Sequence, residues 1–277
     1  MKRISLYPNP QRDPQFLRSA RVAALLKESG AEVLLPVEYA DAFPFSEITA
    51  VSEAALFEES DLLITLGGDG TILSVAERAA KAQLPVFGIN LGHVGFLTSL
   101  EAGDLEAVRD AVNGKLYESS RMLLSCRVGE KEYTALNEFV ITPERGLHML
   151  EAELWVGESQ LCRYRADALI FHTPTGSTGH AFSAGGAVTD ADLDCIGVKA
   201  ASSYLLINSH PMIFSPETQF SLKKITTGAG SSLLCADGRE VELLGADAEI
   251  SIFRSPYRLR LVGLKPHSNM EAYFRKF

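Results

Sequence analysis

A strand signal, a glycine turn and a helix signal in direct succession constrain the fold of this chain most. The run Leu62–Leu66 is almost wholly apolar, as is typical of a strand buried in a parallel sheet. Gly67-Gly68-Asp69-Gly70 follows at once, and Thr71–Ala82 has a helical pattern. In an open α/β sheet, a turn of this kind lies at the carboxyl edge of the strands, where such sheets bind ligands.

The first third of the chain repeats this alternation of strand and helix signals. Strands are expected at residues 4–7, 32–35 and 85–89, and helices at residues 14–28, 53–58 and 104–112. Gly30 and Asn113-Gly114 are helix stop signals. We therefore predict an α/β domain with a doubly wound, open parallel sheet, which is a Rossmann-like arrangement.

From about Leu116 the pattern changes to β. Strand-like runs cover residues 122–128, 131–142, 149–156, 160–165, 168–171, 204–207, 231–235 and 250–253. Gly129-Glu130 and Gly157-Glu158 are suited to hairpin turns. Only Ser183–Ala191 has the pattern for a helical turn or two. We predict a second, β-rich and sandwich-like domain that begins near residue 117.

The composition restricts the kinds of molecule that this chain is expected to bind. Hydrophobic residues make up 46% of the chain and charged residues 22%, as in a globular protein with a sizeable core. The formal net charge of −9 argues against a nucleic-acid-binding surface. There is no signal-peptide pattern, no apolar stretch of ~20 residues and no disulfide or zinc spacing among the four cysteines. We expect a cytoplasmic protein without a nucleic-acid or membrane partner.

The glycine turn allows two interpretations. Glycines let a backbone approach a phosphate closely, and the N-terminus of the following helix favours negative charge. Alternatively, Asp69 caps that helix. The fingerprints Gly-x-x-x-x-Gly-Lys-Ser/Thr and Gly-x-Gly-x-x-Gly are both absent at this turn. The segment Gly88–Leu97 follows the next strand and should open on the same edge, although alone it is also an ordinary glycine-rich turn.

Polar residues gather at two further places. Asn137-Glu138 interrupts an apolar run, and its amide and carboxylate suit a ribose or a carboxamide, or else face water at a strand end. Thr173–Phe182 is rich in Thr, Ser, Pro and Gly, and Ser183-Ala184-Gly185-Gly186 follows it. This composition suits contacts with phosphate or ribose better than core packing.

In this order and spacing, Gly-Gly-Asp-Gly, Asn-x-Gly-x-x-Gly-Phe-Leu, Asn-Glu and Thr-Pro-Thr-Gly-Ser-Thr resemble the motifs of the NAD kinases. The resemblance extends from about Asp61 to Asp237. Diacylglycerol- and sphingosine-type lipid kinases share the first motif, whereas Asn-Glu with Thr-Pro-Thr-Gly-Ser-Thr is specific to the NAD branch. The resemblance implies Mg²⁺-dependent transfer of the γ-phosphoryl group of ATP, or of a polyphosphate, to the adenosine 2′-hydroxyl of NAD. It also implies a homodimer or homotetramer.

The resemblance further implies roles for individual residues. Asp69 would be the general base for the 2′-hydroxyl, and Asn137 and Glu138 would hold a ribose and the nicotinamide side. Asp167 would reach a base across a subunit interface, and Arg165 would supply positive charge. The remaining NAD-binding positions would be Gly70, His148, Thr178, Gly179, His180, Ala181, Phe182, Ser183, Ser202 and Arg239, and the phosphate- or ATP-binding positions would be Gly67, Gly68, Gly70, Thr71 and Asn90.

Family members return their last segment to the first domain. Residues 255–277 are therefore expected to join an α/β domain of residues 1–117, which leaves 118–254 as the β-rich NAD-binding domain. No position is expected to be a protein ligand of a metal, since Mg²⁺ would arrive with ATP.

Four positions depart from the family pattern. Ala168 stands where Gly usually follows the aspartate, Gly179-His180 replaces Ala-Tyr, and Arg239 replaces Gln after Asp237-Gly238. The change to His180 bears on substrate preference and affinity more than on the type of reaction.

Two rival functions are a lipid kinase and a nucleotide sensor without catalysis. A lipid kinase should present an apolar or basic membrane-facing run, which is not seen here. A sensor would not need Asp69. The preferences for NAD or NADH and for ATP or polyphosphate stay open.

Overall fold

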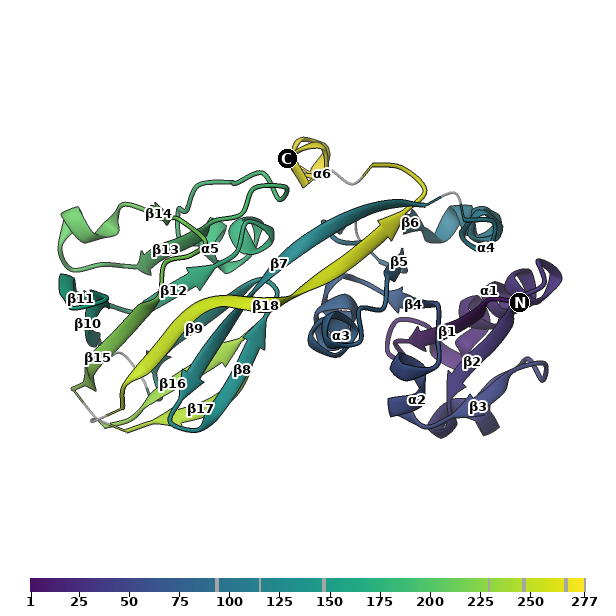
Figure 1. Ribbon diagram of the computed structural model, residues 1–277, viewed down its shortest axis with the longest axis horizontal. Helices are drawn as coiled ribbons and strands as arrows, with labels where there is room; N and C mark the ends of the chain where they lie inside the picture. The colour runs from purple at the N-terminus through teal and green to yellow at the C-terminus, as the bar shows by residue number, and fades with distance from the viewer. Residues whose placement is uncertain are drawn as a thin grey trace. The chain divides into compact units, whose positions relative to one another are not determined.

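The computed structural model describes residues 1–92, 95–114, 116–145, 148–228, 230–245, 248–266 and 269–276. The chain divides into two compact units, one of Met1–Arg121 with Arg258–Phe277 and one of Met122–Tyr257 (Figure 1). Two long strands, β7 (Tyr117–Val128) and β18 (Ile250–Gly263), contribute residues to both units.

The first unit is built on parallel strands in the order β3-β2-β1-β4-β5. The end of β18 pairs in parallel with β5 through Leu261 and Val262. The strands are β1 (Arg3–Pro8), β2 (Glu32–Pro36), β3 (Thr49–Val51), β4 (Leu62–Gly67), β5 (Val86–Asn90) and β6 (Leu100–Glu101). The helices are η1 (Pro14–Phe16), α1 (Leu17–Glu28), η2 (Val37–Ala42), α2 (Glu53–Glu58), α3 (Asp69–Lys81), η3 (Ala102–Val108), α4 (Arg109–Val112) and α6 (Asn269–Lys276), where η denotes a 3₁₀-helix.

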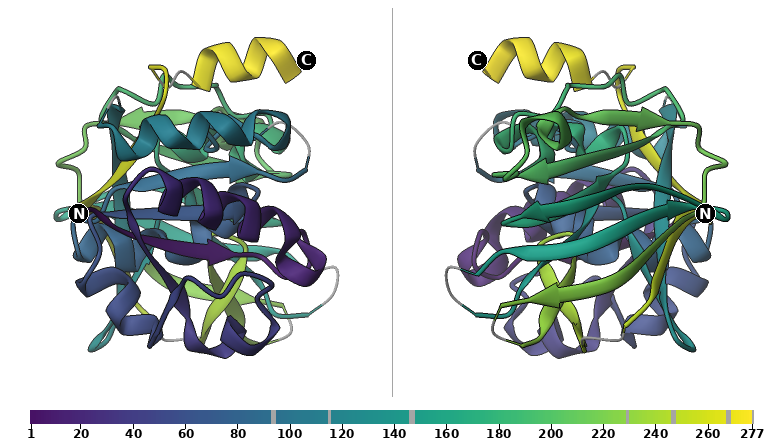
Figure 2. Two further views of the ribbon diagram at one scale, coloured as in Figure 1. Left: turned by 90° about the vertical axis from the view of Figure 1, so that its right-hand side faces the viewer. Right: turned by 90° about the vertical axis from the view of Figure 1, so that its left-hand side faces the viewer.

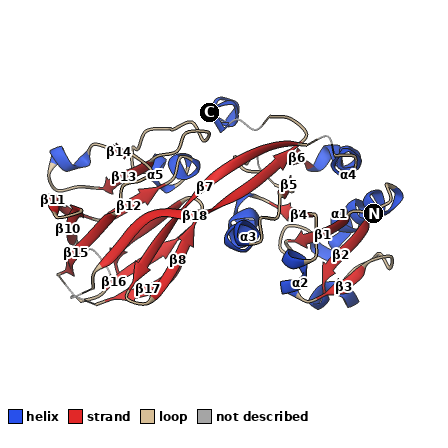
Figure 3. Ribbon diagram, viewed as in Figure 1, coloured by secondary structure: helices blue, strands red, loops and turns tan. Residues whose placement is uncertain are grey.

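Helices cover both faces of this parallel sheet. On one face, Leu6 and Ile64 pack with Leu25 of α1 in a shared apolar core, and Figure 2 (left) shows α1 lying across the strands. On the other face, a Cβ at Gly88 would lie only 2.7 Å from Ile72 Cδ1, so α3 packs closely against β5 there. The prediction of a doubly wound parallel sheet is therefore confirmed (Figure 3).

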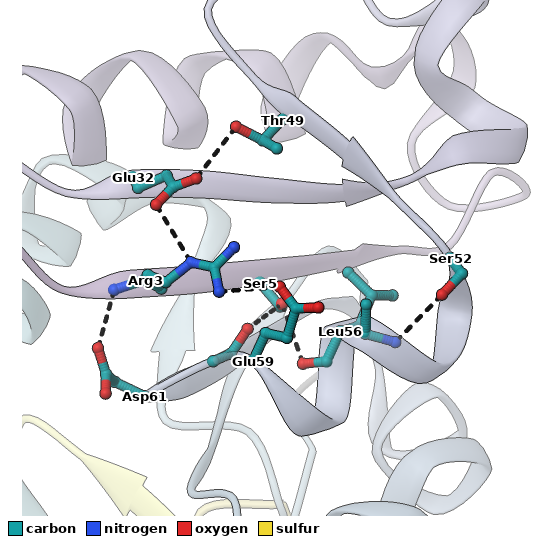
Figure 4. A network of polar contacts seen from close by, with 10 residues as sticks. Arg3, Ser5, Glu32, Thr49, Ser52, Leu56, Glu59 and Asp61 are labelled. Carbon is teal, nitrogen blue, oxygen red and sulfur yellow. Dashed lines mark hydrogen bonds and ion pairs between the residues drawn. The ribbon is translucent and has the colours of Figure 1, made fainter.

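Polar contacts fix the beginning of β1 (Figure 4). The Arg3 guanidinium bonds to Glu32 of β2 at 3.1 Å and to Glu59 at 2.9 Å, and the Arg3 N–H donates to Asp61 at 2.8 Å. These ion pairs reach solvent, and exposed pairs stabilise a fold by at most about 1 kcal/mol each. The apolar core therefore contributes most of the stability of this unit.

The second unit contains two sheets of antiparallel strands. One has the order β14-β13-β12-β9-β16-β17, and the other contains β11, β10, β15, β7, β8 and the first part of β18. The strands are β8 (Lys131–Ala135), β9 (Glu138–Pro143), β10 (Leu150–Val156), β11 (Ser159–Ala166), β12 (Ala168–His172), β13 (Ile196–Ala201), β14 (Met212–Phe214), β15 (Phe220–Thr227), β16 (Ser232–Ala236) and β17 (Arg239–Leu244). The helices are η4 (Thr175–Thr178), α5 (His180–Ser183) and η5 (Leu206–Ser209).

An apolar core joins the two sheets of the second unit. Phe171 of β12 and Phe220 of β15 come from different sheets, and their ring centroids lie 5.4 Å apart. Leu154 and Leu234, also from different sheets, are fully buried in the same cluster. Two sheets that share one core in this way form a sandwich, as predicted. Among the described helices of the whole chain, none has both the length and the apolar character needed to cross a membrane.

Two local predictions are wrong. The helical turns expected at Ser183–Ala191 occur earlier, in η4 and α5, because short-range bonds such as Gly179 N–H to the Gly176 carbonyl (2.9 Å) close the chain there. Residues 204–207, where a strand was expected, are exposed and already enter η5 at Leu206. Ser202 has a positive φ of 49°, which turns the chain out of the β13 ladder before that segment.

Replacing Phe171 by Ala should destabilise the second unit by about 3–5 kcal/mol, because the fully buried ring would leave a cavity between the sheets. Urea unfolding followed by circular dichroism measures the loss. Leu243→Ala is the control, since this side chain is 53% exposed and should change the unfolding free energy by no more than about 0.5 kcal/mol. Equal losses in both variants would contradict the packed core.

Candidate active site

The glycine loop of the first unit is a strand-to-helix turn. β4 ends at Gly67 and α3 begins at Asp69. A Cβ at Gly67 would lie 2.1 Å from Thr71 Oγ1, so a larger residue would displace that hydroxyl. Thr71 Oγ1 accepts hydrogen bonds from the Gly68 N–H at 3.4 Å and from the Asn9 side chain at 3.2 Å. The N-terminus of the 13-residue helix α3 presents backbone N–H groups that favour an anion.

Asp69 lies in the first turn of α3, but it does not cap this helix, whose N-cap is Gly68. Its Oδ2 accepts a hydrogen bond from the Phe96 N–H at 2.8 Å, and its Oδ1 accepts one from the Leu97 N–H at 3.0 Å. A Cβ at Gly95 would lie 2.3 Å from Oδ1, so this glycine lets the loop approach the carboxylate. The loop after β5 therefore fixes the orientation of the Asp69 side chain.

A pocket of about 380 Å³ opens at this edge of the parallel sheet. It is lined by Asn9, Gln11, Arg12, Gly67, Gly68, Asp69, Gly70, Thr71, Asn90, Gly92 and Gly95. Arg12 is the only cation among these described lining residues, and its Nη1 would lie 3.7 Å from a Cβ at Gly92. Asn9, Gln11 and Arg12 were not predicted from the sequence. They follow the end of β1. Because open α/β sheets bind ligands at the carboxyl ends of their strands, the residues after every strand, and not only after β4 and β5, were candidates.

Asn90 ends β5 and is buried. Its amide donates to Glu101 at 2.9 Å, and its side-chain oxygen accepts from the Gly92 N–H at 3.0 Å. These contacts order the loop at one wall of the pocket.

In the second unit, Asn137 and Glu138 lie beside the loop that follows β12. The Thr173 N–H donates to the Asn137 carbonyl at 2.9 Å. A Cβ at Gly176 would lie 2.1 Å from that same carbonyl, so only glycine fits. A Cβ at Gly179 would lie 3.0 Å from Glu138 Oε2 and 3.7 Å from Asn137 Nδ2. The structure thus brings both polar residues together with the Thr-Pro-Thr-Gly-Ser-Thr segment.

Several hydroxyls of that segment hold the loop itself. Ser177 Oγ donates to the Pro174 carbonyl at 2.7 Å and accepts from the Thr189 N–H at 2.9 Å. Thr178 Oγ1 donates to the Thr175 carbonyl at 3.3 Å. In α5, Ala181 packs in a small apolar cluster, Phe182 is half-buried, and His180 and Ser183 are exposed. Residues 178–183 therefore combine a fixed backbone with side chains that reach solvent.

Glu138 is a buried carboxyl group with 6% of its surface exposed. Burial, and secondly the charge of Asp237, raise its pKa to about 7, against the opposing effect of the His180 backbone N–H. Among the described atoms, Glu138 Oε2 has no hydrogen-bond partner. A buried acceptor of this kind suits a hydroxyl or amide donor from a ligand.

Arg165, Asp167 and Ser202 lie at the opposite end of β12 and are exposed. The Arg165 carbonyl accepts from the Tyr204 N–H at 2.8 Å, and its guanidinium lies 4.9 Å from the centre of the Tyr204 ring. The five residues of β12 separate this group from Glu138 by about 17 Å. Within the second unit, the two groups of predicted residues are therefore distinct.

The last two predicted residues are exposed. His148 precedes β10, and its Nδ1 would lie 3.4 Å from a Cβ at Gly228. Arg239 begins β17, where its charge opposes the rise in the pKa of Asp237 that burial causes.

A glycine loop at a helix N-terminus beside a fixed carboxylate is an arrangement suited to phosphoryl transfer. Comparison with known proteins identifies the family. Residues 9–117 match the ATP-NAD kinase N-terminal domain, and residues 136–264 match the ATP-NAD kinase C-terminal domain. The NAD kinase of Natranaerobius thermophilus is 34% identical over 274 residues, which are 97% of this chain and 95% of that protein. The NAD kinase of Symbiobacterium thermophilum is 34% identical over 271 residues, or 95% and 94% of the two chains.

The chain belongs to the NAD kinase family, whose members are phosphotransferases. Two solved structures share its fold. The yeast NADH kinase complexed with NADH has a TM-score of 0.87 at 22% identity, covering 99% of this chain and 86% of that one. An NAD kinase from Archaeoglobus fulgidus in complex with ATP has a TM-score of 0.77 at 26% identity, covering 99% and 98%.

Replacing Glu138 by Gln should remove the part of the pH dependence of the free energy of unfolding that Glu138 causes. Because burial and the charge of Asp237 raise the pKa of Glu138 to about 7, the folded state keeps a proton that the unfolded state releases near pH 4.3. This contribution to stability is complete below the unfolded pKa and is lost as the pH rises through the folded pKa. The free energy of unfolding of the wild type should therefore fall by about 2–3 kcal/mol between roughly pH 5 and pH 8, relative to the variant.

Urea unfolding at a series of pH values measures this difference. Glu158→Gln, at an exposed turn, is the matched control and should keep the wild-type dependence. If Glu138→Gln also kept it, Glu138 would not carry the raised pKa.

Proposed function

We propose that this chain is an NAD kinase that transfers the γ-phosphoryl group of MgATP to the adenosine 2′-hydroxyl of NAD, giving NADP. The observation that carries the proposal is the Asp69 carboxylate, which the Phe96 and Leu97 amides fix in a glycine-lined pocket. Family membership supports NAD as the acceptor. The ATP complex of the Archaeoglobus relative supports ATP as the donor.

MgATP would place its phosphates in the pocket of the first unit. A volume of about 380 Å³ is within the range of small-molecule sites. The backbone N–H groups of Gly68 and Gly70 and the Arg12 guanidinium would neutralise phosphate charge. No group of three or more His, Cys, Asp or Glu suited to a metal occurs among the described residues of the chain. We propose that Mg²⁺ is held mainly by the phosphates, with Asp69 as the carboxylate within reach of the same pocket.

Asp69 would act as the general base. As the 2′-oxygen bonds to the γ-phosphorus, its proton passes to the Asp69 carboxylate, and the bridging oxygen leaves with ADP. The two amide donors hold the carboxylate in one orientation and leave further lone pairs free to accept the hydroxyl proton. An ordinary carboxylate suffices for this role, because the transition state is loose and the proton moves as the new bond forms.

NAD would bind to the second unit. Glu138 Oε2 is a buried acceptor without a partner in the described structure, which suits a ribose hydroxyl. The Asn137 amide lies beside it, and the small Gly179 leaves room next to both groups. Residues Thr178–Ser183 would line the adenosine pocket, where the exposed His180 ring can stack on a base. We assign NAD binding to residues 118–254 and phosphate binding to residues 1–117 with 255–277.

We further propose a homodimer or homotetramer in which Asp167 reaches the NAD bound by a partner subunit. This is supported by the length of β12, which separates Glu138 from Arg165, Asp167 and Ser202. Within one unit, these two groups of residues do not lie together at the same end of a bound dinucleotide. A cytoplasmic location is supported by the four cysteines, which are all free thiols.

Asp69→Asn should lower kcat by about 100-fold or more, since it removes the proton acceptor while keeping the shape of the side chain. NADP formation from NAD and MgATP is measured with an NADP-specific dehydrogenase, and NAD binding by calorimetry, which should change little. Asp110→Asn, an exposed aspartate on α4, is the control. Near-wild-type turnover in Asp69→Asn would refute the base assignment. Tight NAD binding without turnover in the wild type would indicate a sensor. If the wild type showed no NAD binding and no turnover, the lipid kinase alternative would be reopened.

Arg12→Ala should raise the KM for ATP by about 10-fold, because a charge-assisted hydrogen bond to phosphate contributes about 1.5 kcal/mol or more. The KM for NAD should stay at the wild-type value. Arg18→Ala, an exposed arginine on α1, is the control for loss of charge. An unchanged KM for ATP in Arg12→Ala would place the donor phosphates elsewhere.

A further inference from the structure

Asp237 makes the most extensive side-chain contact with the backbone beside Asn137 and Glu138. Its Oδ2 accepts a hydrogen bond from the Leu136 N–H at 2.9 Å. Its Oδ1 accepts from the Asn137 N–H at 2.7 Å and from the Glu138 N–H at 3.2 Å. In return, the Asp237 N–H donates to the Glu138 carbonyl at 3.0 Å.

The turn that carries Asp237 is shaped for this contact. It connects β16 to β17, and Asp237 and Gly238 both have positive φ values, of 48° and 75°. Aspartate tolerates this left-handed region better than most residues, but a glycine would adopt it at lower energy. The carboxylate is therefore the property that distinguishes Asp237 at this position.

Residues 136 and 137 need such a partner because they lie between strands. β8 ends at Ala135 and β9 begins at Glu138, so sheet pairing does not satisfy the intervening backbone groups. Asp237 accepts from the N–H groups, while Thr173 bonds to the carbonyls of Leu136 at 2.6 Å and of Asn137 at 2.9 Å. Two polar residues from distant parts of the sequence thus fix the segment, one through its N–H groups and the other through its carbonyls.

We propose that Asp237 is a positioning residue for the dinucleotide, which acts through the Leu136–Glu138 backbone to hold the Asn137 amide and the Glu138 carboxylate in place. The inference rests on the proposed function, because it concerns the NAD site of that reaction. Asp237 itself needs no contact with the substrate.

The negative charge of Asp237 also acts on the carboxyl group of Glu138. Burial raises the pKa of both carboxyl groups. Only Asp237 receives several backbone N–H bonds, which stabilise its anion, so Asp237 ionises first and its charge disfavours ionisation of Glu138.

The other groups that face this carboxyl pair are cations or neutral. His172 pairs with Glu138 across β9 and β12, and burial lowers its pKa, so its ring is neutral at pH 7. His180 contributes its backbone N–H and has an exposed ring. Arg239 favours the anion of Asp237. Together with burial, the Asp237 anion therefore raises the pH at which Glu138 becomes a full acceptor.

Asp237→Asn tests the proposal. The variant has nearly the same shape, but its NH₂ group would replace one accepting oxygen and would face a backbone N–H, so that two donors meet without an acceptor. The variant also lacks the negative charge. The KM for NAD should rise about 10-fold or more, as expected when binding groups lose their orientation, while the KM for ATP stays unchanged. The acid limb of kcat/KM for NAD should move to lower pH, because the charge that raises the pKa of Glu138 is gone.

Two further variants isolate the effect. Glu240→Gln removes an exposed carboxylate from β17 near the same turn and should leave both the KM and the acid limb unchanged. Glu138→Gln should abolish the acid limb, and adding Asp237→Asn to it should then produce no further shift in pH dependence.

Hydrogen exchange of the wild type provides a test that does not depend on the folding of a variant. The Leu136 and Asn137 amides lie outside the strands, yet they should be protected because Asp237 accepts from them. Rapid exchange of both amides would overturn the proposal.

The outcomes separate this inference from the proposed function. If the wild type makes no NADP, the proposed function fails first. If the wild type makes NADP and Asp237→Asn keeps the wild-type KM for NAD and acid limb, only the positioning role is refuted. A lower melting temperature or a smaller active fraction, with KM and acid limb unmoved, would also overturn it, because those changes indicate a structural role alone.

Discussion

Backbone N–H groups that leave regular secondary structure need acceptors, and aspartate carboxylates supply them at the key loops of this protein. Asp69 accepts from the amides of Phe96 and Leu97 in the first unit. Asp237 accepts from three successive amides in the second. Each carboxylate comes from a distant part of the sequence and closes a loop that carries polar or glycine residues. The same physical need thus orders the proposed phosphate site of the first unit and, separately, the proposed dinucleotide site of the second.

This arrangement resolves an apparent conflict in the charge of the molecule. A chain with a formal net charge of −9 has to bind anionic nucleotides. Oriented amides at a helix N-terminus provide positive potential without adding basic side chains. The glycines at 67 and 95 allow this, because Cβ atoms there would collide with Thr71 and with Asp69. A single exposed arginine then completes the described lining of the pocket.

Local sequence patterns predicted the features that local physics determines. The β4–α3 turn follows from an apolar run, glycines and helical periodicity, all within twenty residues of one another. The helical turns after β12 were misplaced because the position of that loop depends on contacts of Thr173 and Gly176 with the Asn137 carbonyl, a partner distant in sequence. Short-range bonds, such as Gly179 N–H to the Gly176 carbonyl, then close the turns earlier than expected. The role of Asp237 depends on bonds across about a hundred residues, which no short pattern encodes. Arg12 was missed because Pro8-Asn9-Pro10 has the sequence of an ordinary turn. Only the position of the preceding strand in the sheet shows that the residues after it lie at the pocket.

The discontinuity of the first unit has a consequence for how the protein is made. Leu261 and Val262 of β18 pair with Val86 and Phe87 of β5, although β5 leaves the ribosome about 170 residues earlier. Until the second unit has been synthesised, this part of β5 presents an open edge whose backbone groups are able to pair with another chain, since β6 covers only Ile89 and Asn90. Completion of the polypeptide is therefore also the step that protects the growing sheet against association with its neighbours.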